Sequence, residues 1–408
     1  MGTPFRFLHC ADLHIGSAFA GLSRRIPELD GWLSTMPYLA WRNVVETAKK
    51  EKVDFVVIAG DCFDRNAPSL QGRLEFKKGL DELDRAGIPV FVVSGNHDPW
   101  PQAWSEAVRL PENVRFFLTD KAVVHEFVKD GEVVASIAGV SHCSLNVLEN
   151  LAAMTGEALK NAPGVRIAVV HANLGGDMHA APATEAELAS FPVDYWALGH
   201  LHNRRVRRED PFIVYSGSVQ GKDIYEPGTQ GCFIVDCNGF GKLSLTFHPA
   251  SVLTFEIISL DIKEATSIDQ VLKQLLQEIE KVKTDVKLLF RLKISGFTDL
   301  DAELRGWNAD ELHDYFYDGV KNVYPDCFLE ELILLTRTPE GEGTVLLPAD
   351  ELDKAEQELA EEKFLETLYD EMRSVRRELP PVRAPRFEEL RKEGTALLAE
   401  LLTGKLEL

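Results

Sequence analysis

An apolar segment at residues 55–59 leads directly into the motif Gly60-Asp61-Cys62-Phe63-Asp64. An apolar run that ends in glycine predicts a strand that is buried on both faces of a sheet. Open α/β sheets bind their ligands beyond the carboxyl ends of such strands. The two carboxylates at this strand end therefore indicate a functional site, held by a chain that is organised around a buried sheet.

Four further apolar runs are also followed at once by polar motifs. Turns favour Gly, Asn, Asp and Ser, but they do not favour His. One isolated histidine would most simply be structural, whereas histidines that recur at successive strand ends indicate a shared metal site. The five motifs are Asp12-Leu13-His14, Gly60 to Asp64, Gly95-Asn96-His97-Asp98, His171, and Gly199-His200-Leu201-His202.

The chain changes character near residue 250. Residues 254–336 predict a β-α-β-α-β order with few candidate ligands, which is typical of a small α+β domain. The acidic segment that follows predicts a helix whose apolar residues have the spacing of a seam against another helix, from Leu365 to Leu379. The expected domains are 1–250, 251–340 and 341–408.

The formal net charge of −21 argues against generic DNA binding. Non-specific affinity for DNA comes mainly from Lys and Arg side chains that neutralise phosphates. Binding would therefore need local positive charge, either from a metal centre or from a basic patch. The candidate patch is Arg204, Arg205, Arg207 and Arg208, which is either a phosphate-contacting rim or a solvated turn.

The six cysteines are scattered and form no Cys-x-x-Cys pair. This pattern indicates reduced thiols rather than a disulfide framework or a Cys-rich zinc site. The N-terminal segment lacks a signal-peptide core, and no apolar run approaches the roughly 18 residues of a membrane span. We therefore expect a cytoplasmic protein without a membrane partner.

The ordered set of motifs resembles the signature of the calcineurin-like metallophosphoesterases. The forms ADLHIG, GDCFD, SGNHD and ALGHLH, with the later Tyr215-Ser216-Gly217-Ser218, resemble the DNA-repair exonuclease branch of the SbcD type. The shorter-tailed YhaO-like members are the most similar. The resemblance implies an α/β fold, a four-layer α+β sandwich with mixed sheets, followed by a small capping domain and a helical C-terminal tail.

The resemblance also implies two metal ions with ligands from all five motifs. Imidazole and carboxylate ligands suit Mn, Fe or Zn, and the lack of thiolates disfavours a structural zinc site. We expect two divalent ions, Mn²⁺ in first place, with Fe, Mg or Zn as alternatives. The expected ligands are Asp12, His14 and His202 for one ion, Asn96, His171 and His200 for the other, and Asp61 between them.

Two ions about 3.5–4 Å apart lower the pKa of a shared water to about 7 and hold a phosphate for in-line attack. The leaving oxygen then needs a proton. His97 follows the ligand Asn96 but is not itself a ligand in the family pattern, so it is the candidate general acid. Asp64 is expected to orient His97, and Asp98 is expected to cap the turn before Pro99.

The remaining polar candidates are interpreted as structural. His9 is expected in the core, and Cys62 is expected to be buried without binding a metal. Ser216 and Ser218 lack the sequence context of a nucleophile. The other histidines lack partners at ligand spacing, namely residues 125, 142, 179, 248 and 313.

These expectations favour a metal-dependent DNA exonuclease or endonuclease that acts in DNA repair. The resemblance implies DNA as a partner, an SMC-like coiled-coil ATPase that binds the tail, and a homodimer. The tail could instead pack on its own chain. The alternative function is a phosphodiesterase for nucleotides or other small phosphate esters, and a scaffold without metals is disfavoured because every expected ligand is present.

Overall fold

The computed structural model describes most of the chain up to residue 338. The predicted tail at 341–408 lies outside the described residues. The description covers residues 2–338 apart from 18, 20–21, 23–24, 65–68, 102, 105–108, 119–120 and 176–178.

The chain divides into two compact units. The first consists of Met1–Glu256 with two short pieces, Lys283–Phe290 and Asp326–Glu330. The second contains Ile257–Val282 and Arg291–Pro325, and it continues from Glu331. All five polar motifs lie in the first unit.

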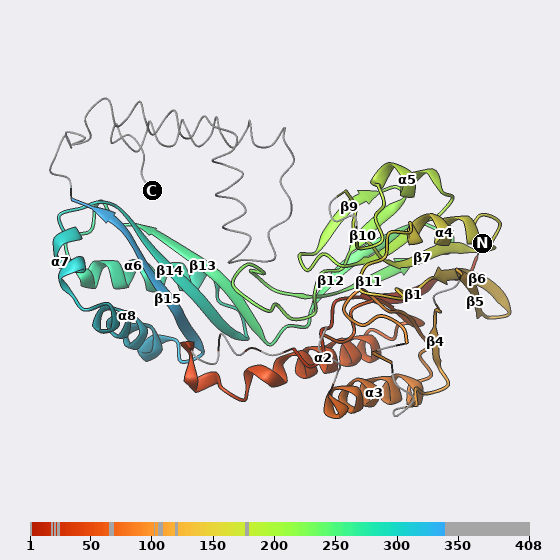
Figure 1. Ribbon diagram of the computed structural model, residues 1–408, viewed down its shortest axis with the longest axis horizontal. Helices are drawn as coiled ribbons and strands as arrows, with labels where there is room; N and C mark the ends of the chain where they lie inside the picture. The colour runs from red at the N-terminus through yellow and green to blue at the C-terminus, as the bar shows by residue number, and fades with distance from the viewer. Residues whose placement is uncertain are drawn as a thin grey trace. The chain divides into compact units, whose positions relative to one another are not determined.

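Two six-stranded sheets form the first unit (Figure 1). The first sheet has the order β12 (Leu243–Pro249), β11 (Gly231–Cys237), β1 (Phe5–Cys10), β2 (Phe55–Ala59), β3 (Val90–Val93) and β4 (Val114–Phe116). The second has the order β5 (Val123–Lys129), β6 (Glu132–Gly139), β7 (Val165–His171), β8 (Tyr195–Gly199), β10 (Phe212–Tyr215) and β9 (Arg205–Glu209).

Both sheets are mixed, with parallel strands where the polar motifs begin. In the first sheet β1, β2, β3 and β4 pair in parallel, while β11 and β12 are antiparallel to their neighbours. In the second sheet β6, β7, β8 and β10 are parallel, and β5 and β9 are antiparallel edge strands. Parallel pairing places the carboxyl ends of the central strands at one edge of each sheet.

The core between the sheets is built from alternate side chains of the central strands. Phe7 and Phe55 of the first sheet belong to the same buried cluster as Val169 and Tyr195 of the second. The two sheets therefore pack face to face through large apolar side chains.

The outer face of each sheet is covered by helices (Figure 1). Trp41 and Leu80, from α2 (Met36–Lys50) and α3 (Leu70–Arg85), share a buried cluster with Val56 of the first sheet. On the second sheet, Trp196 packs in a cluster with residues of α4 (Leu151–Ala158) and α5 (Glu185–Ser190). The order helix, sheet, sheet, helix confirms the expected four-layer sandwich.

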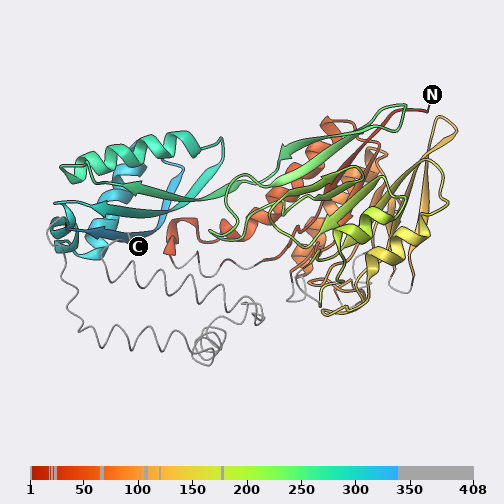
Figure 2. The same cartoon turned by 90° about the horizontal axis from the view of Figure 1, so that it is seen from above.

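The second unit has the α+β character expected for this part of the chain. Its helices are α6 (Ile268–Val282), α7 (Asp301–Gly306) and α8 (Ala309–Val323), and α6 and α8 lie side by side (Figure 1 and Figure 2). The three strands β13 (Leu253–Asp261), β14 (Lys287–Phe297) and β15 (Cys327–Arg337) form one sheet in that order. Among the described residues, no helix is both long and apolar enough to span a membrane.

Phe7 allows a test of the core between the two sheets. Its fully buried ring stacks on Phe55 at a centroid distance of 5.1 Å and meets the edge of Tyr195 at 5.2 Å. Phe7→Ala should lower the free energy of unfolding by about 3–5 kcal/mol, because the truncation leaves a cavity. Guanidinium unfolding followed by circular dichroism measures this change. Leu148→Ala, at a site 64% exposed, should change the value by less than about 0.5 kcal/mol, and similar effects of both variants would contradict this packing.

Candidate metal centre

The polar motifs converge where the two sheets meet. Three of them follow β1, β2 and β3 of the first sheet, and the other two lie at the ends of β7 and β8 of the second. Because these strands are parallel within each sheet, their carboxyl ends deliver the motifs to one place. The residues brought together there are Asp12, His14, Asp61, Asp64, Asn96, His97, His171, His200 and His202.

Backbone hydrogen bonds continue the parallel pairing of β1 and β2 into the loops that follow them. The Asp12 N–H donates to the Gly60 carbonyl at 3.1 Å, and the His14 N–H donates to the Asp61 carbonyl at 3.0 Å. The two loops therefore hold their carboxylates side by side.

Four of the converging residues have backbone conformations that are unfavourable for residues other than glycine. The φ angles are 52° at Asp12, 44° at His14, 50° at Asp61 and 104° at His200. Strained conformations of this kind persist only where the surrounding structure holds them, and they cluster at functional sites. Here they turn the chain sharply enough to direct successive side chains into the centre.

Two glycines of the motifs are required by close contacts. A Cβ atom on Gly95 would overlap the carboxylate of Asp61, and one on Gly60 would overlap the ring of His171. Gly60 also has a φ of 91°, a conformation that glycine adopts without strain. The Gly-Asp and Gly-Asn motifs thus let the backbone approach the candidate ligands.

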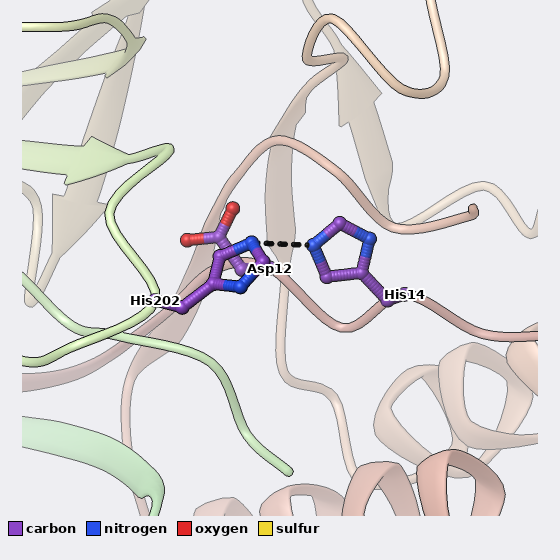
Figure 3. Close-up of side chains that lie close together, drawn as sticks. All are labelled: Asp12, His14 and His202. Atoms are coloured by element: carbon purple, nitrogen blue, oxygen red, sulfur yellow. Dashed lines mark hydrogen bonds between the residues drawn. The ribbon is translucent and has the colours of Figure 1, made fainter. Parts of the chain in front are cut away.

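The first group of candidate ligands consists of Asp12, His14 and His202 (Figure 3). The Nε2 atoms of the two histidines are 3.0 Å apart, and the Asp12 carboxylate lies beside them. One ligand atom from each residue lies within 4.8 Å of the others. This is the set that the sequence assigns to one ion.

The second group surrounds Asn96. Its Oδ1 atom is 2.9 Å from His171 Nε2 and 3.3 Å from His200 Nδ1. Asp61 lies between the two groups, since its Oδ2 atom is 3.4 Å from His171 Nε2 and 3.9 Å from His14 Nε2. The expected bridging position of Asp61 matches this arrangement.

Hydrogen bonds donated by Nδ1 orient two of the candidate histidines. His171 Nδ1 donates to the Ala59 carbonyl at 3.0 Å, and His202 Nδ1 donates to Glu226 Oε1 at 2.5 Å. In each ring the Nε2 lone pair is then free to bind a cation, as in histidine ligands supported by a carboxylate or a carbonyl. The sequence motifs do not include Glu226, and its spacing from His202 carries no signal that could have identified it.

The protonation of the buried groups favours cation binding. Burial lowers the pKa of His171 to about 3 and that of His14 well below its usual value, so both imidazoles are neutral, the form that binds metals. Burial and the nearby Asp61 carboxylate raise the pKa of Asp12 to about 7, although His202 acts in the opposite direction. Two buried carboxylates need cationic partners, and the oxygen and imidazole donors present fit divalent ions.

His97 and Asp64 form a pair at the rim of the centre. His97 Nδ1 is 3.2 Å from Asp64 Oδ1, and Ser17 Oγ donates to Asp64 Oδ2 at 2.8 Å. The side chains of His97 and Asp64 are 23% and 28% exposed, so both are accessible from solvent. Asp64 also lies 3.9 Å from His14 Nδ1, which places this pair directly beside the first group.

The sequence predicts that Asp98 caps the turn before Pro99, but in the structure its carboxylate also binds a second loop. Its buried carboxylate accepts hydrogen bonds from the Gly95 N–H at 2.7 Å and from the Cys62 N–H at 2.8 Å. It therefore ties the loop after β3 to the loop after β2. The expectation of a local cap was too narrow, because the acceptor serves two loops that are distant in the sequence.

Two histidines that the sequence assigns to structural roles, His9 and His142, are buried in the first unit. His9 is fully buried and its Nδ1 lies 3.0 Å from the Tyr195 hydroxyl, which agrees with a core position. His142 is also buried, and its Nε2 lies 2.8 Å from the carbonyl oxygen of His171. It supports the strand end that carries a candidate ligand.

The arginine cluster is not a turn. Residues Arg205–Glu209 form the exposed edge strand β9, paired with β10. The expected turn is therefore wrong, because the antiparallel strand β10 provides a hydrogen-bonding partner that local sequence cannot reveal, whereas the exposure of these residues agrees with a solvated basic segment. An edge strand rich in cations also resists pairing with other chains.

The four arginines differ in their surroundings. The Arg204 guanidinium lies 3.9 Å from the centroid of the Phe247 ring. Arg207 pairs with Glu185 at 3.3 Å, and Arg208 donates to a backbone carbonyl. Of these four, only Arg205 has no ionic or hydrogen-bonded side-chain partner among the described residues.

The fold and the site together define a class of protein. A four-layer sandwich in which carboxylate, imidazole and amide side chains meet at the carboxyl ends of the strands is a metallophosphoesterase. A family model for calcineurin-like phosphoesterases matches residues 5–204.

The chain is also similar to individual proteins. It is 33% identical over 289 residues to the uncharacterized metallophosphoesterase YhaO of Bacillus subtilis (strain 168), covering 69% of this chain and 70% of that one. The chain belongs to the calcineurin-like metallophosphoesterases, and the expected likeness to the YhaO branch is confirmed. It is a hydrolase of a family that cleaves phosphoesters with metal ions.

More distant likenesses also cover well over half of the chain. The chain is 24% identical over 323 residues to the DNA double-strand break repair protein Mre11 of Sulfolobus acidocaldarius, covering 76% of this chain and 80% of that one. A dimetal phosphatase from Danio rerio aligns with a TM-score of 0.40 at 13% identity, over 60% of this chain and 96% of that one.

Glu226→Gln should weaken Mn²⁺ binding about 10-fold or more, because His202 loses the carboxylate that orients its ring. Isothermal titration of the metal-free protein measures the affinity. Glu209→Gln in the exposed strand β9 is the matched control and should bind as the unchanged protein does. Equal affinities for the two variants would show that Glu226 does not support the site.

Substitutions of the two carboxylates in the Gly60 to Asp64 motif should have different effects, one on metal binding and the other on turnover. Asp61→Asn should reduce the metal content below two ions per chain, because the residue lies between both ligand groups. Asp64→Asn should retain the ions but lower turnover of a phosphodiester by about 10²–10⁴-fold, the usual contribution of a general acid–base system. Elemental analysis and steady-state kinetics distinguish them, and equal metal loss in both would refute this division.

Proposed function

We propose that this protein is a metal-dependent nuclease that hydrolyses phosphodiester bonds in DNA. The observation that carries the proposal is the position of the His97–Asp64 pair beside the residues expected to hold two ions. A diester needs both parts, because its phosphate must be held and its leaving oxygen must receive a proton. The similarity to Mre11, whose name describes DNA double-strand break repair, supports DNA as the substrate.

The residues present fit two ions of the kind that bind imidazole and carboxylate, and we propose Mn²⁺. When bound, such ions lower the pKa of water and offset the negative charge of a phosphate ester. The chain's contribution is to fix their positions through two rigid sheets. One ion would be held by Asp12, His14 and His202, the other by Asn96, His171 and His200, and both by Asp61.

His97 would donate the proton to the leaving oxygen. Its Nδ1 faces the Asp64 carboxylate at 3.2 Å, which leaves Nε2 to carry the proton that is transferred. The Asp64 carboxylate orients the His97 ring, and Ser17 holds the carboxylate in place. The backbone N–H of His97 donates to Asp61 Oδ1 at 2.9 Å, so the candidate acid is tied directly to the candidate bridging ligand.

Bound ions would also explain how a chain with a net charge of −21 binds DNA. Two divalent cations outweigh the aspartates that hold them, which leaves local positive charge for a phosphate backbone. The exposed strand β9 adds Arg205, and we propose it as part of the DNA-binding rim. Arg204, Arg207 and Arg208 make contacts within the chain, but each guanidinium has further N–H donors for a phosphate, so we propose them as part of the same rim.

We further propose that the protein acts in the cytoplasm as a dimer with an SMC-like coiled-coil ATPase. The support comes from the apolar spacing between Leu365 and Leu379 in the tail sequence, which suits packing against a partner helix. Co-purification with such an ATPase should require this segment, and polar substitutions at Leu368 and Met372 should abolish it.

Purified protein loaded with Mn²⁺ should degrade linear DNA, and His97→Ala should lower the rate by about 10²–10⁴-fold while two ions remain bound. A gel-based nuclease assay with elemental analysis of the same samples measures both quantities. His313→Ala, on α8 of the second unit, is the control and should retain full activity. Turnover of small diesters without any cleavage of DNA would instead establish the alternative, a phosphodiesterase for nucleotides or small phosphate esters.

A further inference from the structure

His200 faces the second group of candidate ligands with a different ring atom from its neighbours. Its Nδ1 atom lies 3.3 Å from Asn96 Oδ1, the same oxygen that His171 Nε2 approaches at 2.9 Å. In His171 and His202 it is Nδ1 that makes the supporting hydrogen bond. In His200 the ring is turned the other way, so a supporting partner has to be found at Nε2.

Asn173 supplies a contact at this atom. Its side-chain amide nitrogen lies 3.2 Å from His200 Nε2. Asn173 follows two residues after His171, the last residue of β7. An asparagine just beyond a strand end is readily explained by turn chemistry, so the sequence alone does not mark it as part of the site.

The backbone of Asn173 is held in place by its own hydrogen bonds. The Asn173 N–H donates to the Ala180 carbonyl at 2.9 Å, and the Asn173 carbonyl accepts from the Ala183 N–H at 3.1 Å. Both peptide groups of this residue are thereby paired with a later part of the same connection between β7 and α5.

Tyr215, the last residue of β10, holds the residues on either side of Asn173. Its fully buried hydroxyl donates to the Ala172 carbonyl at 2.8 Å and accepts from the Leu174 N–H at 3.1 Å. The backbone that carries Asn173 is therefore fixed before and after it. A side chain on such a backbone has a defined position, which is what the orientation of a neighbouring ring requires.

Hydrogen-bond chemistry gives the contact between Asn173 and His200 a direction when an ion is bound. A neutral imidazole carries one proton, so a ring that binds an ion through Nδ1 has its N–H at Nε2. That N–H needs an acceptor. The amide of Asn173 provides one after half a turn about its terminal bond, which exchanges the positions of its oxygen and its nitrogen.

We propose that Asn173 is a positioning residue for the second ion, and that its amide oxygen accepts a hydrogen bond from His200 Nε2 and so holds Nδ1 toward Asn96. This inference rests on the two-ion site of the proposed function, but it does not depend on DNA as the substrate. Asn173 then has for His200 the role that Glu226 has for His202.

Calorimetric titration of the metal-free protein with Mn²⁺ tests this role without any substrate. Asn173→Ala should weaken the binding of one of the two ions about 10–100-fold, because His200 loses its acceptor, and should leave the other ion nearly unchanged. Asn173→Asp keeps an acceptor oxygen in the same place and should restore most of the affinity. Asn146→Ala, at an exposed position before α4, is the matched control and should bind both ions as the unchanged protein does.

A carboxylate at residue 173 could also attract the ion through its charge, so a second measurement reports on the hydrogen bond itself. In the Zn²⁺-loaded protein with ¹⁵N-labelled histidine, the His200 ring should carry its proton on Nε2. The signal of this proton is identified by its absence from His200→Asn. It should be lost to exchange with water in Asn173→Ala and retained in Asn173→Asp.

The outcomes for Asn173→Ala decide between positioning and a general structural role. The melting temperature of this variant without metal should match that of the unchanged protein, because the backbone hydrogen bonds do not need the side chain. Unchanged affinity for both ions would overturn the inference, and so would equal weakening of both ions or a lowered melting temperature. If Asn173→Asp binds the ions as weakly as Asn173→Ala, the amide does not act as an acceptor and the inference is wrong.

The same measurements separate this inference from the proposed nuclease activity. A loss confined to one ion, with rescue by Asn173→Asp, would uphold the role of Asn173 even if the unchanged protein cleaves no DNA, a result that overturns the nuclease proposal alone. Cleavage of DNA by a protein in which Asn173→Ala binds both ions normally would overturn the role of Asn173 alone. Fewer than two ions in the unchanged protein would overturn both the two-ion site and this inference.

Discussion

The rest of the site depends on the need to compensate two buried negative charges, the carboxylates of Asp12 and Asp61. Each is at most 1% exposed, and burying an uncompensated charge costs several kcal/mol. Backbone donors meet part of this cost, since Asp12 accepts from the His200 N–H at 3.1 Å and Asp61 from the His97 N–H at 2.9 Å. The remaining charge is met when cations bind, so ion binding stabilises the folded state as well as the reaction.

The same carboxylates explain why the scaffold must be rigid. Strained backbone at Asp12, His14, Asp61 and His200 costs on the order of 1–3 kcal/mol each. The Asp12 and Asp61 bonds join loops from different strands, and Asp98 adds a further tie between loops. Beneath them lie fully buried strands with large aromatic side chains, which resist the relaxation that would release the strain.

The sequence predicts those parts of the site that follow an apolar strand directly. His14, Asp61, Asn96 and His202 could be identified because strand and ligand are adjacent in the chain, and parallel pairing then brings the strand ends together. Glu226 could not be identified in this way. It reaches His202 because β11 runs antiparallel to β1, so that the loop before β11 arrives where β1 ends. The pairing of β11 with β1 and the edge position of β9 both depend on contacts across a whole sheet. Neither can be recognised from the residues next to it in the sequence.

The β10–β11 loop also makes the two halves of the centre different. On the His14–His202 side it supplies a carboxylate from Glu226. On the other side, His171 is oriented by the backbone carbonyl of Ala59, which carries no net charge. The imidazole of His202 is therefore oriented by a charged acceptor and that of His171 by a neutral one. The two sides of the centre thus differ in charge, and the side chain that makes the difference belongs to the loop rather than to the candidate metal ligands.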